Sequence, residues 1–280
     1  MKVAWTDVQT RRLRELNADE LQQSSVFISA LERDKAFQKL NRLLVKKGRD
    51  HLKALKDNNY RPELCRLESW LVEKLTENGF VQVVTPIILA RGLLIKMGIN
   101  ADHPLSLQIF WIGNNKCLRP MLAPNLYFVL KDLLRLWEWP VRIFEIGPCF
   151  RKESQGTLHL NEFTMLNLVE MGLPEEKRHE RMEQLAAIVM EVSGLNEYRL
   201  TPALSEIYGS TTDIMAGHPE FEVGSGAMGP HPIDDAWGIN APWIGIGFGL
   251  ERLLMAKEKR SNFKSVGRSL TYLDGVRLNI

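Results

Sequence analysis

The apolar positions of the chain alternate between helical and extended periods. Four leucines recur at steps of three and four residues, namely Leu64, Leu67, Leu71 and Leu75. This spacing predicts a helix, and Asn78-Gly79 ends it in the usual C-terminal manner. The following stretch, 80–86, is rich in β-branched residues and predicts a strand, and 105–112 predicts another.

Later segments continue the mixture. Pro124 begins a predicted helix, and 141–150 and 163–171 predict the two strands of a hairpin. A further helix begins at Pro174 and stops at Gly194, and the final third is extended until 248–260 returns to a helical period. Because strands and helices do not alternate regularly, the sequence predicts an α+β fold with a mostly antiparallel sheet flanked by helices.

Basic residues form one stripe on a predicted N-terminal helix. They recur at steps of four and three and are Lys35, Lys39, Arg42, Lys46, Arg49, Lys53 and Lys56. An unbroken helix of this length spans about 33 Å, enough to follow several phosphates of a nucleic acid. Gly48 marks a point where the helix could bend or break, and a plain solvated face is the alternative interpretation.

The charge distribution and a linker divide the chain into two predicted domains. Residues 1–61 carry a net charge of +6 and the remainder a net charge of −4, which the total of +2 conceals. The segment 56–62, KDNNYRP, is rich in turn formers and reads as a linker. We therefore expect a basic helical extension, 1–61, and a larger domain, 62–280.

Composition narrows the class of protein. The 280 residues are 45% hydrophobic and 25% charged, which is typical of a globular protein with a sizeable core. No apolar run approaches a membrane span and the N-terminus lacks a secretory pattern, so we expect a cytoplasmic protein without membrane contact. Cys65, Cys117 and Cys149 are far apart and suggest neither a zinc site nor disulfides.

Two charged motifs carry candidate chemistry. In 243–254, WIGIGFGLERLL, the alternate glycines Gly245, Gly247 and Gly249 leave one strand face without side chains, and Arg252 follows in the first helical turn. At the end of the predicted hairpin strand, Arg151 and Glu153 share a face. A guanidinium suits a phosphate, although a packing device and a surface salt bridge are the alternatives for the two motifs taken singly.

In this order, the motifs resemble motifs two and three of class II aminoacyl-tRNA synthetases. The stretch GFVQVVTP resembles motif one, which in that family builds the dimer interface. LRPMLAPNLY, IFEIGPCFRKES, HLNEFTMLNL and PWIGIGFGLERLL further resemble the pyrrolysyl-tRNA synthetase family from about residue 62 onward. The N-terminal segment is too short for a separate tRNA-binding domain, so the resemblance implies the compact form, whose basic stripe would contact the tRNA.

The resemblance also implies roles for individual residues. Arg151 would hold the α-phosphate of ATP, Arg252 the γ-phosphate, and Glu222 and Ser225 would help to place magnesium. The remaining residues of the implied nucleotide site are Phe163, which would stack on adenine, and Glu153, His159 and Leu160. For His159, an ordinary loop histidine is an equally good interpretation.

The implied amino-acid pocket is almost entirely apolar or aromatic. Its residues are Ala123, Leu126, Tyr127, Leu130, Asn167, Val169, Tyr208, Ala227, Trp243 and Gly245. Such a wall suits a long uncharged side chain and penalises the ammonium group of lysine, while Asn167 offers one amide to a substrate carbonyl. For most of these residues, a simple core position is the alternative.

The implied function is an ATP- and magnesium-dependent ligase, a homodimer, that charges its cognate amber-decoding tRNA with pyrrolysine. Two alternatives stay open. One is a class II synthetase for another large amino acid, and the other is a catalytically silent synthetase-like regulator that binds RNA. Intact Arg151, Arg252 and Glu222 argue against a silent relative.

Overall fold

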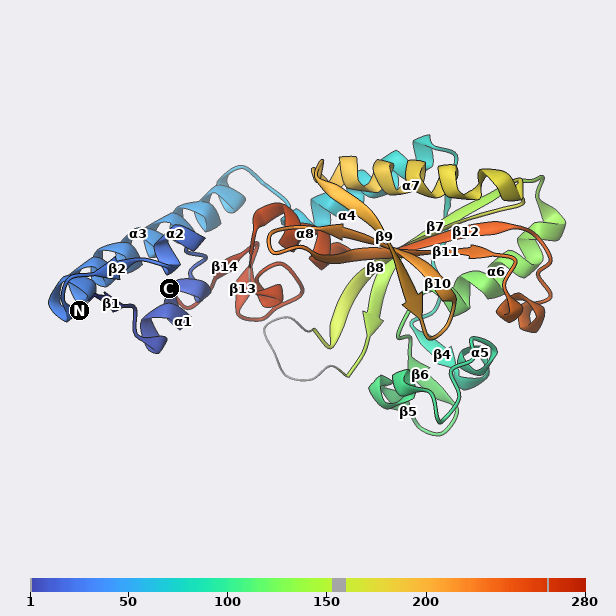
Figure 1. The fold of residues 1–280 in the computed structure, drawn as a ribbon, viewed down its shortest axis with the longest axis horizontal. Helices are drawn as coiled ribbons and strands as arrows, with labels where there is room; N and C mark the ends of the chain where they lie inside the picture. Colours follow the sequence, from blue (N-terminus) through green and yellow to red (C-terminus); the bar gives the residue numbers. More distant parts are fainter. Residues whose placement is uncertain (1, 153–159, 261) are drawn as a thin grey trace. The chain divides into compact units, whose positions relative to one another are not determined.

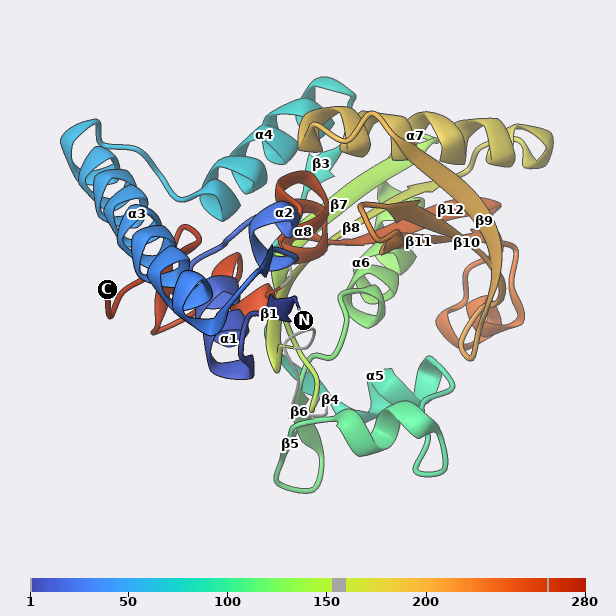
Figure 2. The ribbon, with the colours of Figure 1, turned by 60° about the vertical axis from the view of Figure 1, so that its left-hand side comes forward.

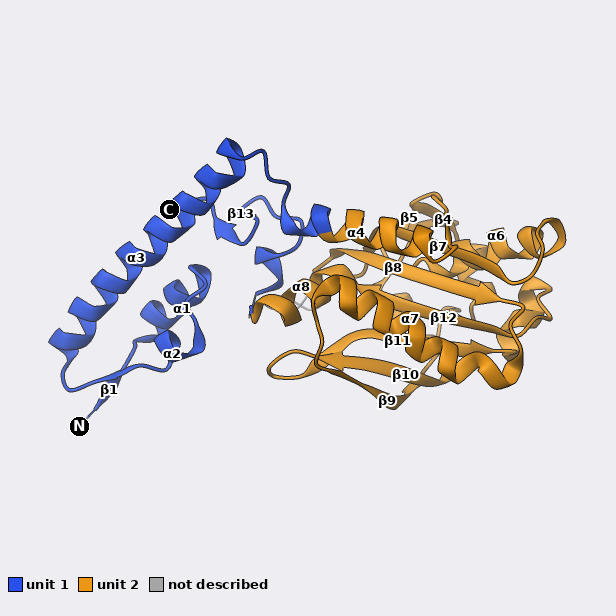
Figure 3. Ribbon diagram, turned by 90° about the horizontal axis from the view of Figure 1, so that it is seen from above, with its two compact units in different colours: residues 1–66, 260–280 blue, residues 67–259 orange. Residues whose placement is uncertain are grey.

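The computed structural model describes residues 2–152, 160–260 and 262–280. The chain divides into two compact units, residues 1–66 with 260–280, and residues 67–259 (Figure 3). Residues 260–280, which the sequence analysis grouped with the larger domain, thus belong to the same unit as the N-terminal helices.

Unit 2 is built on a seven-stranded sheet with the order β3-β7-β8-β12-β11-β10-β9 (Figures 1 and 2). The strands are β3 (Val81–Gln82), β7 (Val141–Phe150), β8 (Glu162–Met171), β9 (Tyr198–Ser205), β10 (Gly209–Ala216), β11 (Phe221–Gly229) and β12 (Trp243–Gly249). Among these described strands, each neighbouring pair is antiparallel except β3 with β7. The predicted α+β class and the predicted hairpin, β7 and β8, are confirmed.

Helices cover both faces of this sheet (Figures 1 and 2). They are α4 (Glu63–Glu77), α6 (Ala123–Leu136), the 3-10 turn η2 (Glu175–Lys177), α7 (Arg178–Ser193), the 3-10 turn η3 (Pro232–Trp237) and α8 (Leu250–Glu258). On one face, Met182 of α7 lies so close to β11 that a Cβ on Gly226 would be 3.0 Å from its Cε. On the other face, α6 packs against Val169, Ala227 and Trp243 in one core cluster.

A smaller sheet, β4-β6-β5, precedes α6. Its elements are β4 (Ile88–Ala90), α5 (Arg91–Lys96), η1 (Pro104–Gln108), β5 (Trp111–Ile112) and β6 (Lys116–Leu118). The predicted strand over 105–112 is wrong for most of its length. Pro104 begins a 3-10 turn there, and the ring Nδ1 of His103 caps it by accepting a 3.1 Å hydrogen bond from the amide of Leu105.

Unit 1 has a core of its own. Its elements are β1 (Val3–Ala4), α1 (Asp7–Glu15), α2 (Glu20–Gln23), β2 (Val26–Phe27), α3 (Ala30–Asp57), η4 (Phe263–Ser265), β13 (Tyr272–Leu273) and β14 (Val276–Arg277). The core residues are Trp5, Leu13, Leu16, Ala18 and Leu44. Gly48 does not break α3. A Cβ there would lie 2.9 Å from the Cδ1 of Ile280, so the glycine allows the C-terminal segment to lie against the helix.

Candidate functional site

Arg151 lies immediately after β7, beside the first residues of β8. Its Nε donates a 2.9 Å hydrogen bond to the carbonyl of Pro120, and its guanidinium carbon lies 5.4 Å from the centre of the Phe163 ring. The backbone amide of Arg151 donates to the carbonyl of Asn161 at 3.0 Å, which continues the β7–β8 ladder by one step. The hairpin therefore brings a cation and an aromatic face together.

Arg252 is located at the same end of the sheet. It follows β12, which is parallel to β7 because both strands are antiparallel to β8. Gly249 pairs with Met165, two residues along β8 from Phe163 and on the same face. A Cβ on Gly249 would lie 3.4 Å from the Cδ of Arg252, so the stem of Arg252 covers that face as well. Both predicted phosphate-binding arginines thus lie over one face at one end of the sheet.

A β-bulge places Glu222 on this face. Residues three apart in a regular strand point to opposite faces, so Glu222 and Ser225 would ordinarily be separated. Here Met215 pairs with Glu222, but its neighbour Ile214 pairs with Gly224, and Val223 is the extra residue. The bulge therefore puts Glu222 and Ser225 on one side of β11.

The hydroxyl of Ser225 donates a 2.7 Å hydrogen bond to the Oδ1 of Asp213, its cross-strand partner. Glu222 forms an ion pair with Arg252, with 3.1 Å between its Oε2 and the Nη1 of the arginine. Carboxylate and hydroxyl oxygens suit Mg²⁺, which binds to proteins through few side chains and takes further ligands from water and substrate phosphates. Among the described residues, no group of three or more His, Cys, Asp or Glu side chains could hold a metal ion.

Two glycines of β12 lie at the centre of two cross-strand rows on the same face. Asn167, Gly247 and Ser225 are cross-strand partners, and in the next row Val169, Gly245 and Ala227 are partners. A Cβ on Gly247 would lie 3.1 Å from the Oδ1 of Asn167. Gly247 thus allows the Asn167 amide to lie close to β12, while the binding of a ligand along these glycines stays a prediction.

Helix α6 faces these rows with an aromatic wall. Tyr127 donates a 3.0 Å hydrogen bond to the Oδ1 of Asp234, and the Nε1 of Trp243 donates to the Oδ2 of the same residue at 2.8 Å. Tyr127 stacks on Trp237 at 5.3 Å, and the ring of Tyr208 lies 6.0 Å from that of Trp243. Burial, with Tyr208 and Asp234 nearby, raises the pKa of Tyr127 far above its ordinary value, so the phenol remains a donor.

The other predicted pocket residues belong to the same cluster. Leu126 and Leu130 are buried in it, and Ala123 and Tyr208 are partly buried against it. Leu160 is half-buried just before β8. Glu153 and His159 lie outside the described residues. The structure thus brings the described pocket residues together, while their roles toward a substrate stay predictions.

The basic stripe is also present as predicted. Its members are all exposed on α3, and they are Lys35, Lys39, Arg42, Lys46, Arg49, Lys53 and Lys56. The opposite side of the helix contributes Leu44 to the core of unit 1 and packs Phe37 and Leu40 against it. The stripe is therefore a solvent-facing cationic surface, and its tRNA contact stays a prediction.

Four charged residues of this region escaped the sequence analysis. Asp213 and Asp234 anchor site side chains, while Arg119 and Glu145 form a buried ion pair of 2.6 Å. The sequence contained one signal for the ion pair. Glu145 interrupts the apolar strand VRIFEIG, and a buried charge requires a partner.

Comparisons with known proteins agree with this geometry. A family model described as tRNA synthetase class II core domain (G, H, P, S and T) matches residues 111–257. The threonine–tRNA ligase of Finegoldia magna is 35% identical over 34% of this chain, and the O-phosphoserine–tRNA(Cys) ligase of Methanoculleus marisnigri is 25% identical over 55%. The chain spans only 16% and 30% of these two curated relatives.

Solved structures match over the full length. The crystal structure of pyrrolysyl-tRNA synthetase from Desulfitobacterium hafniense is 54% identical, with a TM-score of 0.93 and 99% of each chain covered. A second structure of a pyrrolysyl-tRNA synthetase from that organism is 52% identical, with a TM-score of 0.91, 99% of this chain and 96% of the other covered. The chain therefore belongs to the class II aminoacyl-tRNA synthetases and, within them, to the pyrrolysyl-tRNA synthetase family.

Proposed function

We propose that this protein activates pyrrolysine with ATP and transfers it to the 3′ end of an amber-decoding tRNA. The observation that carries the proposal is the shared face at one end of the sheet, where Arg151, Phe163, Arg252 and Glu222 lie together. An adenine ring on Phe163 would leave the triphosphate between the two arginines. The family membership supports the same reaction.

In the first step, the carboxylate of the amino acid attacks the α-phosphorus, and the bond from this phosphorus to the bridging oxygen of pyrophosphate breaks. The nucleophile is already ionised, so the step requires orientation and positive charge rather than a strong base. Arg151 would stabilise the charge on the α-phosphate and Arg252 that on the γ-phosphate. The resemblance assigns Glu153, His159 and Leu160 to the remainder of the nucleotide site.

Magnesium fits the oxygen ligands that the bulge of β11 provides. Glu222 and Ser225 would hold the ion, with Asp213 fixing the Ser225 hydroxyl. When bound, it would supply positive charge to the phosphates.

In the second step, the 3′-hydroxyl of the terminal adenosine of tRNA attacks the carbonyl carbon of the adenylate, and AMP leaves. The exposed stripe on α3 would bind the phosphate backbone of the tRNA. Unit 1, which contains residues 1–61, would thus provide the tRNA-contacting extension, and unit 2 would be the catalytic part.

The apolar and aromatic wall supports selection of pyrrolysine. Tyr127, Trp243 and Tyr208 offer a large uncharged surface, and Asn167 would bind a substrate carbonyl. Lysine would lose the hydration of its ammonium group without gaining a partner. Val169, Gly245 and Ala227 form one cross-strand row that would set the space for the distal ring.

We further propose that the enzyme is a cytoplasmic homodimer. Motif one contains the exposed apolar side chains Val84, which is 87% exposed, and Val81, which is 46% exposed, and Ile88, two residues beyond the motif, is 53% exposed. Contiguous apolar exposure of this kind is typical of an interface. Among the described residues, no helix has the length and hydropathy that a bilayer span requires.

The test measures exchange of pyrophosphate into ATP, followed by aminoacylation of the amber-decoding tRNA. The substrates are pyrrolysine, a carbamate analogue, lysine and a panel of other large amino acids. We expect exchange and charging with the first two and little with lysine. Exchange with a different large amino acid alone would indicate a synthetase of other specificity, and no exchange with any amino acid would indicate a silent RNA-binding relative.

A further inference from the structure

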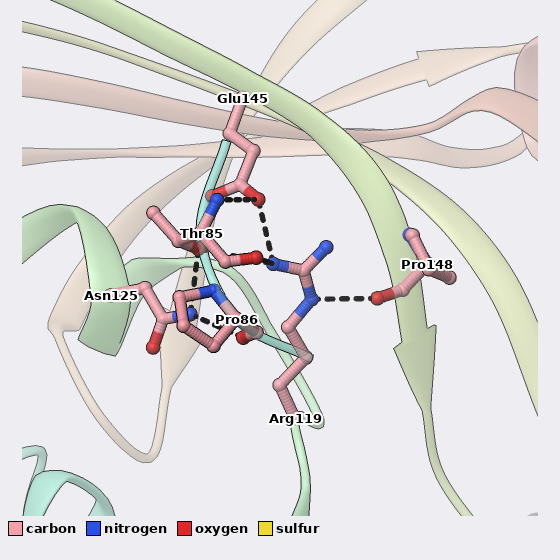
Figure 4. Close-up of polar contacts among 6 residues, drawn as sticks. All are labelled: Thr85, Pro86, Arg119, Asn125, Glu145 and Pro148. Atoms are coloured by element: carbon pink, nitrogen blue, oxygen red, sulfur yellow. Dashed lines mark hydrogen bonds and ion pairs between the residues drawn. The ribbon is translucent and has the colours of Figure 1, made fainter. Parts of the chain in front are cut away.

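A buried polar network lies on the same face of the sheet as the phosphate-binding residues (Figure 4). Arg119 and Glu145 are 2% and 1% exposed, and their Nη1 and Oε1 atoms are 2.6 Å apart. Glu145 also accepts hydrogen bonds from the amide of Thr85 at 3.1 Å and from its hydroxyl at 2.7 Å. Asn125 of α6 donates to the Thr85 hydroxyl at 2.7 Å and to the Pro86 carbonyl at 2.9 Å.

This network is tied to Arg151 by three short connections. The Nε of Arg119 donates to the carbonyl of Pro148 at 2.8 Å, which fixes the end of β7. The carbonyl of Arg119 accepts from the amide of Phe150 at 2.9 Å. The next carbonyl in the chain, that of Pro120, accepts from the Nε of Arg151 at 2.9 Å. The backbone that leads into Arg151 and the Nε of Arg151 itself are thus held by the side chain and backbone of the 119–120 segment.

The strand is shaped to admit the Arg119 side chain. A Cβ on Gly147 would lie only 2.2 Å from the Nη2 of Arg119, so the glycine provides the space for the guanidinium. A buried ion pair contributes little net stability compared with an apolar pair of similar volume, because desolvation offsets the attraction. Stability alone therefore gives no reason to place a charged pair here, whereas fixing a geometry does.

We propose that Arg119, paired with Glu145, is a positioning residue for the phosphate-binding Arg151. The pair fixes the Pro120 carbonyl, and this carbonyl orients the Arg151 guanidinium over Phe163. The inference rests on the proposed function, since it assigns Arg151 to the α-phosphate.

The experiment is a double-mutant cycle. The pair is replaced by R119M/E145M, alone and combined with R151A, and amino-acid-dependent pyrophosphate exchange is measured. With Arg151 present, we expect the pair replacement to lower kcat about 10- to 100-fold. In the R151A background, we expect a change of less than about twofold, because the pair acts only through Arg151.

A control uses a different ion pair of β7, which joins this strand to β8. Arg142 of β7 and Glu170 of β8 are cross-strand partners 3.1 Å apart, and Glu170 is 3% exposed. They lie toward the opposite end of these strands from Arg151. R142M/E170M should change the melting temperature without changing kcat. G147A, which crowds Arg119 without removing a charge, should lower kcat in the same Arg151-dependent way.

Equal losses in both backgrounds, or no loss with Arg151 present, would overturn the proposal. The Kd of ATP is also measured by calorimetry for every variant of the cycle. This measurement separates the proposed positioning role of Arg119 from the proposed function. If the unaltered protein shows no exchange with any amino acid, the proposed function fails. The calorimetric cycle then still decides whether Arg119 positions Arg151 for a triphosphate, because coupling supports that role and additivity contradicts it.

Discussion

Arg252 holds Glu222 at two points. Its Nη1 donates a 2.8 Å hydrogen bond to the Glu222 carbonyl and lies 3.1 Å from the Glu222 Oε2. Both side chains are about 40% exposed, at 42% and 43%. The contact therefore joins the first turn of α8 to the bulge in β11 without burying either charge.

Substituting Arg252 by lysine should separate geometry from charge. R252K keeps the positive charge but loses the planar fork, so we expect pyrophosphate exchange to fall about 100-fold. The melting temperature should change little, because exposed ion pairs contribute at most about 1 kcal/mol. R135K is the matched control, since Arg135 forms an exposed 2.8 Å ion pair with Asp132 on α6 and neither residue is assigned to the site. An R252K enzyme with unaltered exchange would contradict the γ-phosphate role.

Reversing three charges of the basic stripe should weaken the binding of tRNA and leave the reaction with ATP unchanged. With K39E/K46E/K53E, we expect weaker tRNA binding and a slope of log K against log salt that is smaller by about 2 to 3. Adenylate formation should remain nearly unchanged. The control reverses three exposed lysines of unit 2, Lys116, Lys131 and Lys177. Equal loss of binding and adenylate formation would point to misfolding, and an unchanged salt slope would exclude the stripe from the tRNA contact.

Substituting Asp234 should raise the KM for the amino acid more than the KM for ATP. It accepts from Tyr127, from Trp243 and from the backbone amide of His231, the last at 2.7 Å. D234A leaves these three donors without their acceptor, so we expect the KM for the amino acid to rise about tenfold or more. The KM for ATP should stay within about twofold. The exposed neighbour Asp235 provides the control D235A, and parallel increases in both KM values would contradict the assignment.

Alkaline pH should destabilise the protein through its buried thiols. Burial raises the pKa of Cys149 to about 12 and that of Cys117 to about 11, from an ordinary value of 9.0. An unfolded thiol ionises near pH 9 while the folded one stays protonated. The stability is therefore complete below about pH 9 and is lost as the pH rises toward the folded pKa, by up to about 1.4 kcal/mol per pH unit for each thiol.

Urea denaturation at pH 8.5 and pH 10.5 measures this loss. C149A should show a smaller difference in unfolding free energy between the two pH values than the unaltered protein does. Tyrosines also ionise in this range, but their contribution is common to both proteins and cancels. Identical pH differences in the two proteins would show that Cys149 does not titrate as its burial requires.

Long, strongly patterned segments could be predicted from the sequence. The strand 141–150 was predicted with the bounds that β7 has, because ten mostly apolar residues in a row leave few alternatives. The exposed stripe on α3 followed from helical periodicity. By contrast, η1 escaped detection because proline and a histidine cap decided the local backbone against the apolar run of 105–112.

Features that depend on tertiary pairing could not be predicted. Arg119 and Glu145 are 26 residues apart in the chain, and this spacing does not predict their contact. Asp213 and Asp234 looked like ordinary polar residues until the sheet register and η3 placed them beside Ser225 and Tyr127. These four residues hold the side chains of the site in place. The residues proposed to contact the substrates, by contrast, could be identified from the sequence motifs.

The proposed metal ligation depends on the one extra residue in β11, Val223, as well as on the residue types of the ligands. Two homologous chains could agree at every functional position and still differ in which side of the strand the carboxylate occupies, if one of them lacked this residue. A column-by-column alignment with a gap there would score such chains as equivalent. For this family, the length of the segment between Ala216 and Ser225 is therefore as informative about catalytic competence as the residues within it.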